Sequence, residues 1–287
     1  MTAPMAVRRP RGSIFATETA DRPMLRAFLE NDRLYAAYAL CDLDDREFVR
    51  TRWGVALVGE TPIAVALQYA GYSPQPLFVM GENAGIASIL DDVIKPRAAY
   101  VAARSEHLAA VGTCYRVEPG QAMYRMWVDR EQFRPLEASA LRLGPDDIAD
   151  LNRLYQLGFA AWLPATAITE GLYYGIRVGN RLVSAAGTHV ISPAAGLAVV
   201  GNVMTHADHR GRGYATAVTS AVTAELLGFC DHVVLNVRTD NPPALAAYRH
   251  LGYQVHTTFE ERLIHRTEAV WSGWTETLRR MFSRKET

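Results

Sequence analysis

The hexapeptide Arg210-Gly211-Arg212-Gly213-Tyr214-Ala215 is the stretch of the chain best suited to bind an anion. It follows an uncharged apolar run, residues 197–204, which predicts a strand buried on both faces. Apolar residues at steps of three and four come after it and predict a helix. The first N–H groups of a helix lack internal acceptors and carry partial positive charge. Glycines allow close approach of a phosphate, and arginines add full charges. The pattern predicts a phosphate site; the alternative is an ordinary strand-to-helix connection.

Two other nucleotide-binding patterns do not fit this turn. Its spacing is not G-x-G-x-x-G, and no acidic residue closes a second strand at the expected distance, so a Rossmann site is excluded. No Gly-Lys-Ser/Thr follows, so a P-loop is excluded as well.

Composition and charge limit the class of protein. The 287 residues suffice for two domains, and 49% apolar with 21% charged residues is ordinary for a soluble globular chain. Thirty basic side chains balance thirty acidic ones, so we expect neither nucleic acid nor a membrane as partner. Cys41, Cys114 and Cys230 are scattered and predict free thiols in a reducing compartment, with no metal site.

No run of about 18 apolar residues occurs, so a membrane span is not expected. The N-terminus carries arginines but lacks the apolar stretch of a signal peptide. We therefore expect a cytoplasmic protein whose residues 1–23 form a flexible tail.

The first half of the chain reads as a mixed domain over residues 24–135. Helical spacing covers residues 22–41, and the segment Gly81-Glu82-Asn83-Ala84-Gly85 is interpreted as a turn, because it contains an acid and no cation. Extended runs occupy residues 53–58, 63–70, 76–80, 98–103 and 121–128.

The second half, residues 136–266, reads as a second domain. A helix is predicted over residues 145–159, and Gly179-Asn180 predicts a tight hairpin turn between strands 172–178 and 182–191. A strand over residues 232–237 precedes a helix that starts after Asn241 and stops at Gly252. Residues 253–259 and 262–265 look extended.

Residues 267–287 predict a C-terminal helix with one aromatic stripe that includes Trp271 and Trp274. We expect it to pack on its own domain. The alternatives are a contact in a homodimer and a helix on a membrane surface.

Two motifs lie together in the second half. One is Val203-Met204-Thr205 followed by Arg210-x-x-Gly213-x-Ala215; the other is Asn241-x-x-Ala244-x-x-x-Tyr248-x-x-x-Gly252-Tyr253. In order and spacing, residues 138–260 resemble the GNAT superfamily of acyl-CoA-dependent N-acyltransferases. The plan of the whole chain is similar to the glycine N-acyltransferase branch and other tandem GNAT proteins. The resemblance implies an α+β fold of two GNAT-like lobes, each a mostly antiparallel sheet flanked by helices, with the N-terminal lobe degenerate.

The resemblance also implies a binding site for acetyl-CoA. Backbone groups of Val203, Met204 and Thr205 would pair with the pantetheine arm, and one N–H would polarise the thioester carbonyl. The turn from Arg210 to Thr216 would hold the pyrophosphate. Asn241 would contact the CoA arm, although an Asn before proline can also be only an N-cap.

Tyr248 is the proton donor that the resemblance implies. Amine attack on a thioester releases a thiolate, and a phenol at the mouth of the cleft can protonate it. Holding both substrates side by side supplies rate without a covalent enzyme intermediate. The alternative is that Tyr248, between Leu245 and Leu251, only packs in the core.

A general base must take a proton from the amine, and the sequence leaves its identity open. Glu170, before the first strand of the hairpin, and His189, on the second, are the candidates, acting directly or through water. His206 follows the central strand, and Asn202 alternates with the packed positions of that strand, which would turn it toward the cleft. The alternative for either histidine is a structural role.

These inferences predict an N-acetyltransferase whose acceptor is a primary amine of a small molecule. Two alternatives stay open: an acyl-CoA sensor without turnover, and an enzyme that acetylates proteins.

Overall fold

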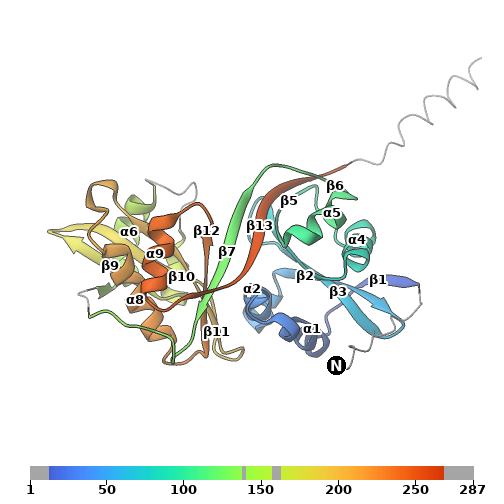
Figure 1. Cartoon of the computed structure of the whole chain (residues 1–287), viewed down its shortest axis with the longest axis horizontal. Helices are drawn as coiled ribbons and strands as arrows, with labels where there is room; N and C mark the ends of the chain where they lie inside the picture. The colour runs from blue at the N-terminus through green and yellow to red at the C-terminus, as the bar shows by residue number, and fades with distance from the viewer. Residues whose placement is uncertain (1–12, 138–139, 157–162, 268–287) are drawn as a thin grey trace, which may run out of the picture.

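The described strands form one continuous sheet. The computed structural model describes residues 13–137, 140–156 and 163–267. Within them, a 13-stranded sheet runs in the order β1-β2-β3-β4-β5-β13-β7-β12-β11-β10-β9-β8, and β6 pairs with β13. Helices flank this mostly antiparallel sheet, which confirms the α+β prediction (Figure 1).

The N-terminal lobe, residues 13–117, supplies one side of the sheet. Its helices are α1 (Arg22–Leu29), α2 (Ala37–Cys41), α3 (Asp45–Phe48), α4 (Asn83–Asp92) and α5 (Leu108–Gly112). Its strands are β1 (Ile14–Glu18), β2 (Thr51–Val58), β3 (Thr61–Tyr69), β4 (Gln75–Gly81), β5 (Ala98–Ala103) and β6 (Tyr115–Val117).

The C-terminal lobe, residues 141–253, supplies the other side. Its helices are α6 (Ile148–Tyr155), α7 (Ala165–Glu170), α8 (Tyr214–Leu226) and α9 (Pro242–His250). Its strands are β8 (Leu141–Arg142), β9 (Tyr173–Val178), β10 (Arg181–Ser192), β11 (Leu197–Thr205) and β12 (His232–Arg238).

Two long strands join the lobes. β7 (Gln121–Val128) follows the N-terminal lobe in sequence but pairs antiparallel with β12 of the C-terminal lobe. β13 (Gln254–Arg266) follows the C-terminal lobe, pairs with β7, and then pairs with β5 of the N-terminal lobe. The two strands cross the middle of the molecule side by side (Figure 1). Each lobe is therefore completed by chain from the other half.

One face of the central sheet is covered by helices of the N-terminal lobe. Leu25 of α1 and Leu40 of α2 belong to the same buried cluster as Val199 of β11 and Val234 of β12. Burial of this apolar surface fixes α2 against the strands of the other lobe. Side chains on α2 can therefore reach a site in the C-terminal lobe.

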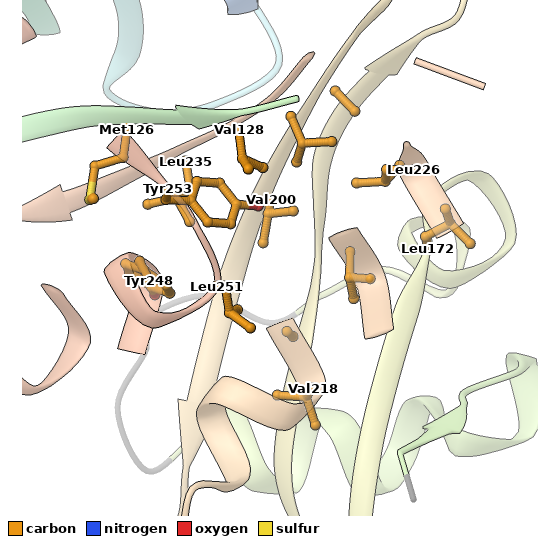
Figure 2. Close-up of a cluster of buried hydrophobic side chains, with 14 of the residues drawn as sticks. Met126, Val128, Leu172, Val200, Val218, Leu226, Leu235, Tyr248, Leu251 and Tyr253 are labelled. Atoms are coloured by element: carbon orange, nitrogen blue, oxygen red, sulfur yellow. The ribbon is translucent and has the colours of Figure 1, made fainter. Parts of the chain in front are cut away.

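The opposite face of the C-terminal lobe is covered by α8 and α9. Val218 of α8 and Leu251 after α9 pack on Val200 and Leu235 of the sheet (Figure 2). This core holds the first turn of α8 at the end of β11.

The prediction of a flexible tail through residue 23 is wrong for its last part. Ile14–Glu18 is a strand that pairs antiparallel with β2, and α1 begins at Arg22 with the Asp21 side chain as its N-cap. Strand pairing along a sheet edge supplies order that the apolar pattern of five residues does not reveal. Residues 1–12 lie outside the described residues.

The predicted C-terminal helix and its dimer contact fall on residues 268–287, outside the described part, and stay predictions. The domain boundary near residue 135 also stays a prediction. Over the described ranges, no helix combines the length and the apolar character that crossing a bilayer requires.

Candidate active site

Strands β11 and β12 pair in parallel and then separate. Their pairing covers Leu197–Val200 opposite His232–Leu235 and ends there, although β11 continues to Thr205 and β12 to Arg238. The first four residues of β11 are buried, and the next five are only half-buried. We call residues 201–205 and 236–238 the fork. Along the fork, the edge of β11 that faces away from β10 has no partner strand among the described residues.

Two β-bulges shape the wall of the fork. Between the pairs Ala185–Met204 and Gly187–Gly201, β11 has one residue more than β10, and Asn202 there takes a left-handed φ of 54°. Between Thr188–Val200 and the next pair, β10 has one residue more, which is His189. Bulges re-aim side chains, and Asn tolerates the left-handed conformation. They bring His189 and Asn202 together.

The His189 ring lies over Gly201 and is held at both nitrogens. A Cβ at Gly201 would lie 2.2 Å from Nε2, so only glycine leaves room for the ring. Nε2 lies 3.2 Å from the Asn202 Oδ1, and Nδ1 lies 2.6 Å from the Tyr38 hydroxyl of α2.

The hydrogen bonds of Asn202 define the protonation of this histidine. Its Nδ2 donates to the Tyr173 hydroxyl at 3.0 Å, which orients the amide so that Oδ1 faces His189. Because Oδ1 can only accept, Nε2 carries the proton and Nδ1 accepts from Tyr38. The Tyr155 hydroxyl donates to the Asn202 carbonyl at 2.6 Å and supports the bulge.

His189 is crowded by protein but open to solvent on one side. Its side chain keeps an exposed surface, while desolvation by its neighbours lowers its pKa below the ordinary value, and the Asn202 hydrogen bond acts in the opposite direction. A histidine with a lowered pKa is neutral at pH 7 and can accept a proton.

The turn before α8 presents a row of backbone donors. Gly211 and Gly213 have φ of 74° and 76°, and a Cβ at either would meet nothing within 4 Å. Among the described residues, none of the N–H groups of residues 211–216 donates a hydrogen bond. Arg210 and Arg212 are exposed beside them. This arrangement suits a phosphate, as the sequence predicts.

Tyr248 of α9 packs in the core under the fork. It is 7% exposed, and its ring lies 6.1 Å from that of Tyr253 (Figure 2). Burial raises its pKa to about 12, and its hydroxyl has no hydrogen bond within the described chain. The Tyr248 ring therefore packs in the core, as the alternative interpretation of the sequence expects. Its hydroxyl stays protonated and is free to donate a hydrogen bond.

Two other predicted site residues have structural partners. The Asn241 side chain accepts from the Ala244 N–H at 3.3 Å and caps α9, so the N-cap interpretation is confirmed. Glu170, at the end of α7, forms an ion pair with Arg46 of α3. Glu170 thus links the lobes and, in the described part, bonds to no group of the fork.

The corresponding region of the N-terminal lobe is filled. Beyond the parallel pair of β4 and β5, the Tyr35 hydroxyl donates to the Val79 carbonyl at 3.1 Å, and the Arg104 guanidinium lies 4.3 Å from the Tyr35 ring. At the start of α4, Asn83 bonds to His107 at 2.9 Å. The prediction that residues 81–85 form a turn is wrong: Gly81 ends β4, Glu82 is the N-cap, and Asn83–Asp92 is α4, so the segment is a direct strand-to-helix connection.

Comparison with known proteins agrees with this geometry. A family model described as FR47-like protein matches residues 173–263, which include β9 to β12, both predicted motifs and most of β13. A search of curated proteins gave no match.

Solved structures extend the likeness to both lobes. A GNAT-family acetyltransferase from Novosphingobium aromaticivorans is 20% identical, with 71% of this chain and 89% of that chain covered and a TM-score of 0.54. A GCN5-related N-acetyltransferase from Sphaerobacter thermophilus is 14% identical over 89% and 97%, with a TM-score of 0.59. A tandem GNAT protein from the clavulanic acid biosynthesis pathway is 13% identical over 90% and 100%, with a TM-score of 0.54. None of these names singles out the glycine N-acyltransferase branch, which stays a prediction. The chain has the two-lobed fold of GNAT-family acetyltransferases.

Proposed function

We propose that this protein transfers an acyl group, with acetyl as the first candidate, from acyl-CoA to a primary amine of a small molecule. The observation that carries this proposal is the fork: an open strand edge that ends at the unbonded N–H groups of residues 211–216.

Acyl-CoA fits the two parts of this feature. The pantetheine arm contains amide groups, which can bond to the open edge of β11 as an added strand would. The diphosphate would then reach the N–H groups of residues 211–216, with Arg210 and Arg212 beside it. Backbone N–H groups of residues 203–205 are the candidates to polarise the thioester carbonyl.

Tyr248 is the proposed acid. The amine attacks the carbonyl carbon, the carbon–sulfur bond breaks, and the thiolate takes the Tyr248 proton. The raised pKa keeps the hydroxyl protonated. Burial disfavours the thiolate as well, so the pKa of the thiol rises in the same direction.

A relay of Tyr38 and His189 is the proposed base. An amine proton would pass to the Tyr38 oxygen as the Tyr38 proton moves to the His189 Nδ1, 2.6 Å away. The resulting imidazolium keeps its Nε2 bond to Asn202. Desolvation raises the pKa of Tyr38, so it stays a phenol between transfers. Glu170 has no place in this relay, because Arg46 holds it.

Coverage of the fork by α2 favours a small acceptor over a protein chain. Tyr38 of α2 bonds directly to the wall of the fork, which narrows access from that face.

Release of CoA from acetyl-CoA, measured with a panel of small amines and peptides, tests the proposal. We expect release that depends on a small amine. Tight acetyl-CoA binding without release in any mixture would support a sensor instead, and release with peptides alone would support a protein acceptor.

A further inference from the structure

Arg125 is a buried cation without a counter-ion in contact. It lies on β7, directly opposite Asn236 of β12 and Thr257 of β13, and is 2% exposed. No carboxylate in the described chain lies within ion-pair distance of it. Removing an unpaired charge from water is costly, so such a group in a folded protein needs an explanation.

One side of the Arg125 guanidinium already donates hydrogen bonds to the backbone. Nη1 donates to the Tyr35 carbonyl at 2.6 Å and to the Leu34 carbonyl at 3.4 Å. Nε is buried without an acceptor, and Nη2 has none among the described residues. Nε and Nη2 form one edge of the guanidinium, and two parallel N–H groups on one edge match the two oxygens of a carboxylate.

The surroundings hold the cation in place without neutralising it. The guanidinium lies 4.9 Å from the Phe259 ring and 5.3 Å from the Tyr38 ring, measured to the ring centroids. Aromatic rings stabilise a cation but offer no acceptor in the plane of its N–H groups. The rings therefore orient the free edge and leave it unbonded.

Arg125 is adjacent to the fork. Asn236, its cross-strand neighbour, is the first residue of β12 beyond the parallel pairing with β11, and its Oδ1 is also buried without a partner. On the other side, the Tyr38 ring that contacts Arg125 carries the hydroxyl bonded to His189. Arg125, Tyr38 and His189 thus form a continuous wall.

We propose that Arg125 binds the carboxylate of the acceptor, and that the acceptor is therefore an amine that also carries a carboxylate. This inference rests on the proposed function. The amine lies at the Tyr38 hydroxyl and the carboxylate pairs with Nε and Nη2 of Arg125, so that both groups of one small molecule are fixed before acyl transfer. Arg125 is a specificity-determining residue and takes no part in proton transfer.

Nearby acids favour a carboxylate over a phosphate. Glu261 of β13 is close enough to interact electrostatically with both Arg125 and Tyr38, and Asp42 of α2 interacts with Tyr38. A phosphate brings up to two charges, and an ionised Glu261 repels it more strongly than a carboxylate with one, whereas Asp42 keeps its proton at pH 7 and adds no charge.

The test compares matched acceptors on the intact chain. CoA release from acetyl-CoA is measured with amino acids, with the amines that lack only the carboxylate, and with aminoalkyl phosphates of equal length. We expect kcat/KM to be about 10- to 100-fold higher for the amino acids, as for loss of a charge-assisted hydrogen-bonded pair. Equal values for amino acids and plain amines would overturn the inference and leave the acyltransferase proposal standing. A preference for the phosphates would overturn the choice of carboxylate.

A variant pair assigns this preference to Arg125. Arg125→Gln should reduce the ratio of kcat/KM for amino acids to kcat/KM for plain amines to nearly one, whatever its effect on the absolute rates. Arg130→Gln is the matched control, because Arg130 also donates to backbone carbonyls, those of Leu227 and Cys230, but lies away from the fork. A preference unchanged in Arg125→Gln contradicts the assignment. If that variant does not fold, the wild-type comparison decides. Absence of release with every amine contradicts the acyltransferase proposal itself, and this inference with it.

Discussion

The Tyr38 hydroxyl lies 2.6 Å from the His189 Nδ1, and this hydrogen bond joins the two lobes across 151 residues of sequence. Tyr38 comes from α2 and His189 from a bulge in β10, at the wall of the fork. Each lobe is also completed by a strand from the other half, through β7 and β13. The candidate site is therefore a product of both lobes, although the binding motifs lie in one.

Replacing Tyr38 with Phe should slow turnover. The variant keeps the ring but interrupts the relay to His189, and loss of general base catalysis typically costs about 10²-fold or more. We expect kcat to fall by about that factor while the Kd for acetyl-CoA is unchanged, as measured by steady-state kinetics and calorimetry. An unaltered kcat would remove Tyr38 from the mechanism.

The pH profile of kcat tests His189 independently. The relay works only while His189 is neutral, and desolvation lowers its pKa below the usual value of about 6.5. As pH falls, activity should therefore persist through pH 6.5 and be lost only below it. The measurement uses a saturating acceptor of low amine pKa, so that protonation of the amine does not itself cause a loss of activity at acidic pH. Under these conditions the acid limb of the kcat profile should be absent from His189→Gln, whose kcat is low at every pH. An acid limb that is unchanged in this variant belongs to another group.

Replacing Tyr248 with Phe should affect the acid step alone. The hydroxyl has no partner in the described structure, so its loss costs little stability, whereas the leaving thiolate loses its proton donor. We expect a lower kcat with unchanged acetyl-CoA affinity. Tyr253→Phe is the control: its hydroxyl bonds to Thr223 at 2.7 Å in the core, so that variant should be less stable, by about 1 kcal/mol, yet equally active. A Tyr248→Phe variant that loses stability but keeps the wild-type kcat would show that Tyr248 only packs in the core.

Replacing Gly213 with Ala should weaken CoA binding. A left-handed alanine costs about 1 kcal/mol, and the new methyl group projects beside the N–H groups of residues 211–216. Gly179→Ala in the β9–β10 turn is the matched control, because its φ is 58° and its Cβ would also meet open space. Both variants should lose similar stability, but only Gly213→Ala should lose affinity. Equal affinities would contradict the phosphate assignment.

Stability should fall as pH rises toward 8 because of Asp42. This carboxyl is 6% exposed, and burial, followed by repulsion from Glu47 and Asp44, raises its pKa to about 8. The folded chain holds a proton that the unfolded chain releases near pH 4, so stability present below pH 4 is lost between pH 4 and 8, by at most about 1.4 kcal/mol per pH unit.

Asp42→Asn should remove this loss. Its melting temperature relative to wild type should rise between pH 5 and pH 8, because the amide needs no proton to stay neutral. Asp45→Asn, at an exposed position, is the control and should keep the wild-type slope. If the melting temperatures of Asp42→Asn and wild type differ by the same amount at pH 5 and at pH 8, then Asp42 is not the group that causes the loss of stability.

Local signals made the framework of the C-terminal lobe predictable. The Gly179-Asn180 turn joins β9 and β10 as expected, because a left-handed glycine is a short-range requirement. Asn241 caps α9 for the same kind of reason. The two-lobed fold was implied by the resemblance of the two motifs to those of the GNAT superfamily. These features depend on residues close in sequence.

The bulges, the partner of β7 and the positions of Tyr38 and Arg125 depend on contacts between residues far apart in the sequence, which local patterns do not predict. The bulges at His189 and Asn202 depend on the register between β10 and β11, and each bulge shifts that register by one residue. Residues 121–128 were assigned to the first half, whereas β7 pairs with β12, because strand partners are chosen by tertiary packing. Tyr38 sits in an apolar helical stripe and reads as core, since its partner is in the other lobe. Arg125 carried no local signal of burial.

The central claim is that the fork binds acyl-CoA, with its diphosphate on the N–H groups of residues 211–216. A crystal structure of the protein with acetyl-CoA tests it most directly. The account predicts the pantetheine arm along β11 from Gly201 to Thr205, with the sulfur near the Tyr248 hydroxyl. Acetyl-CoA bound elsewhere, or an empty fork at saturating acetyl-CoA, would contradict it.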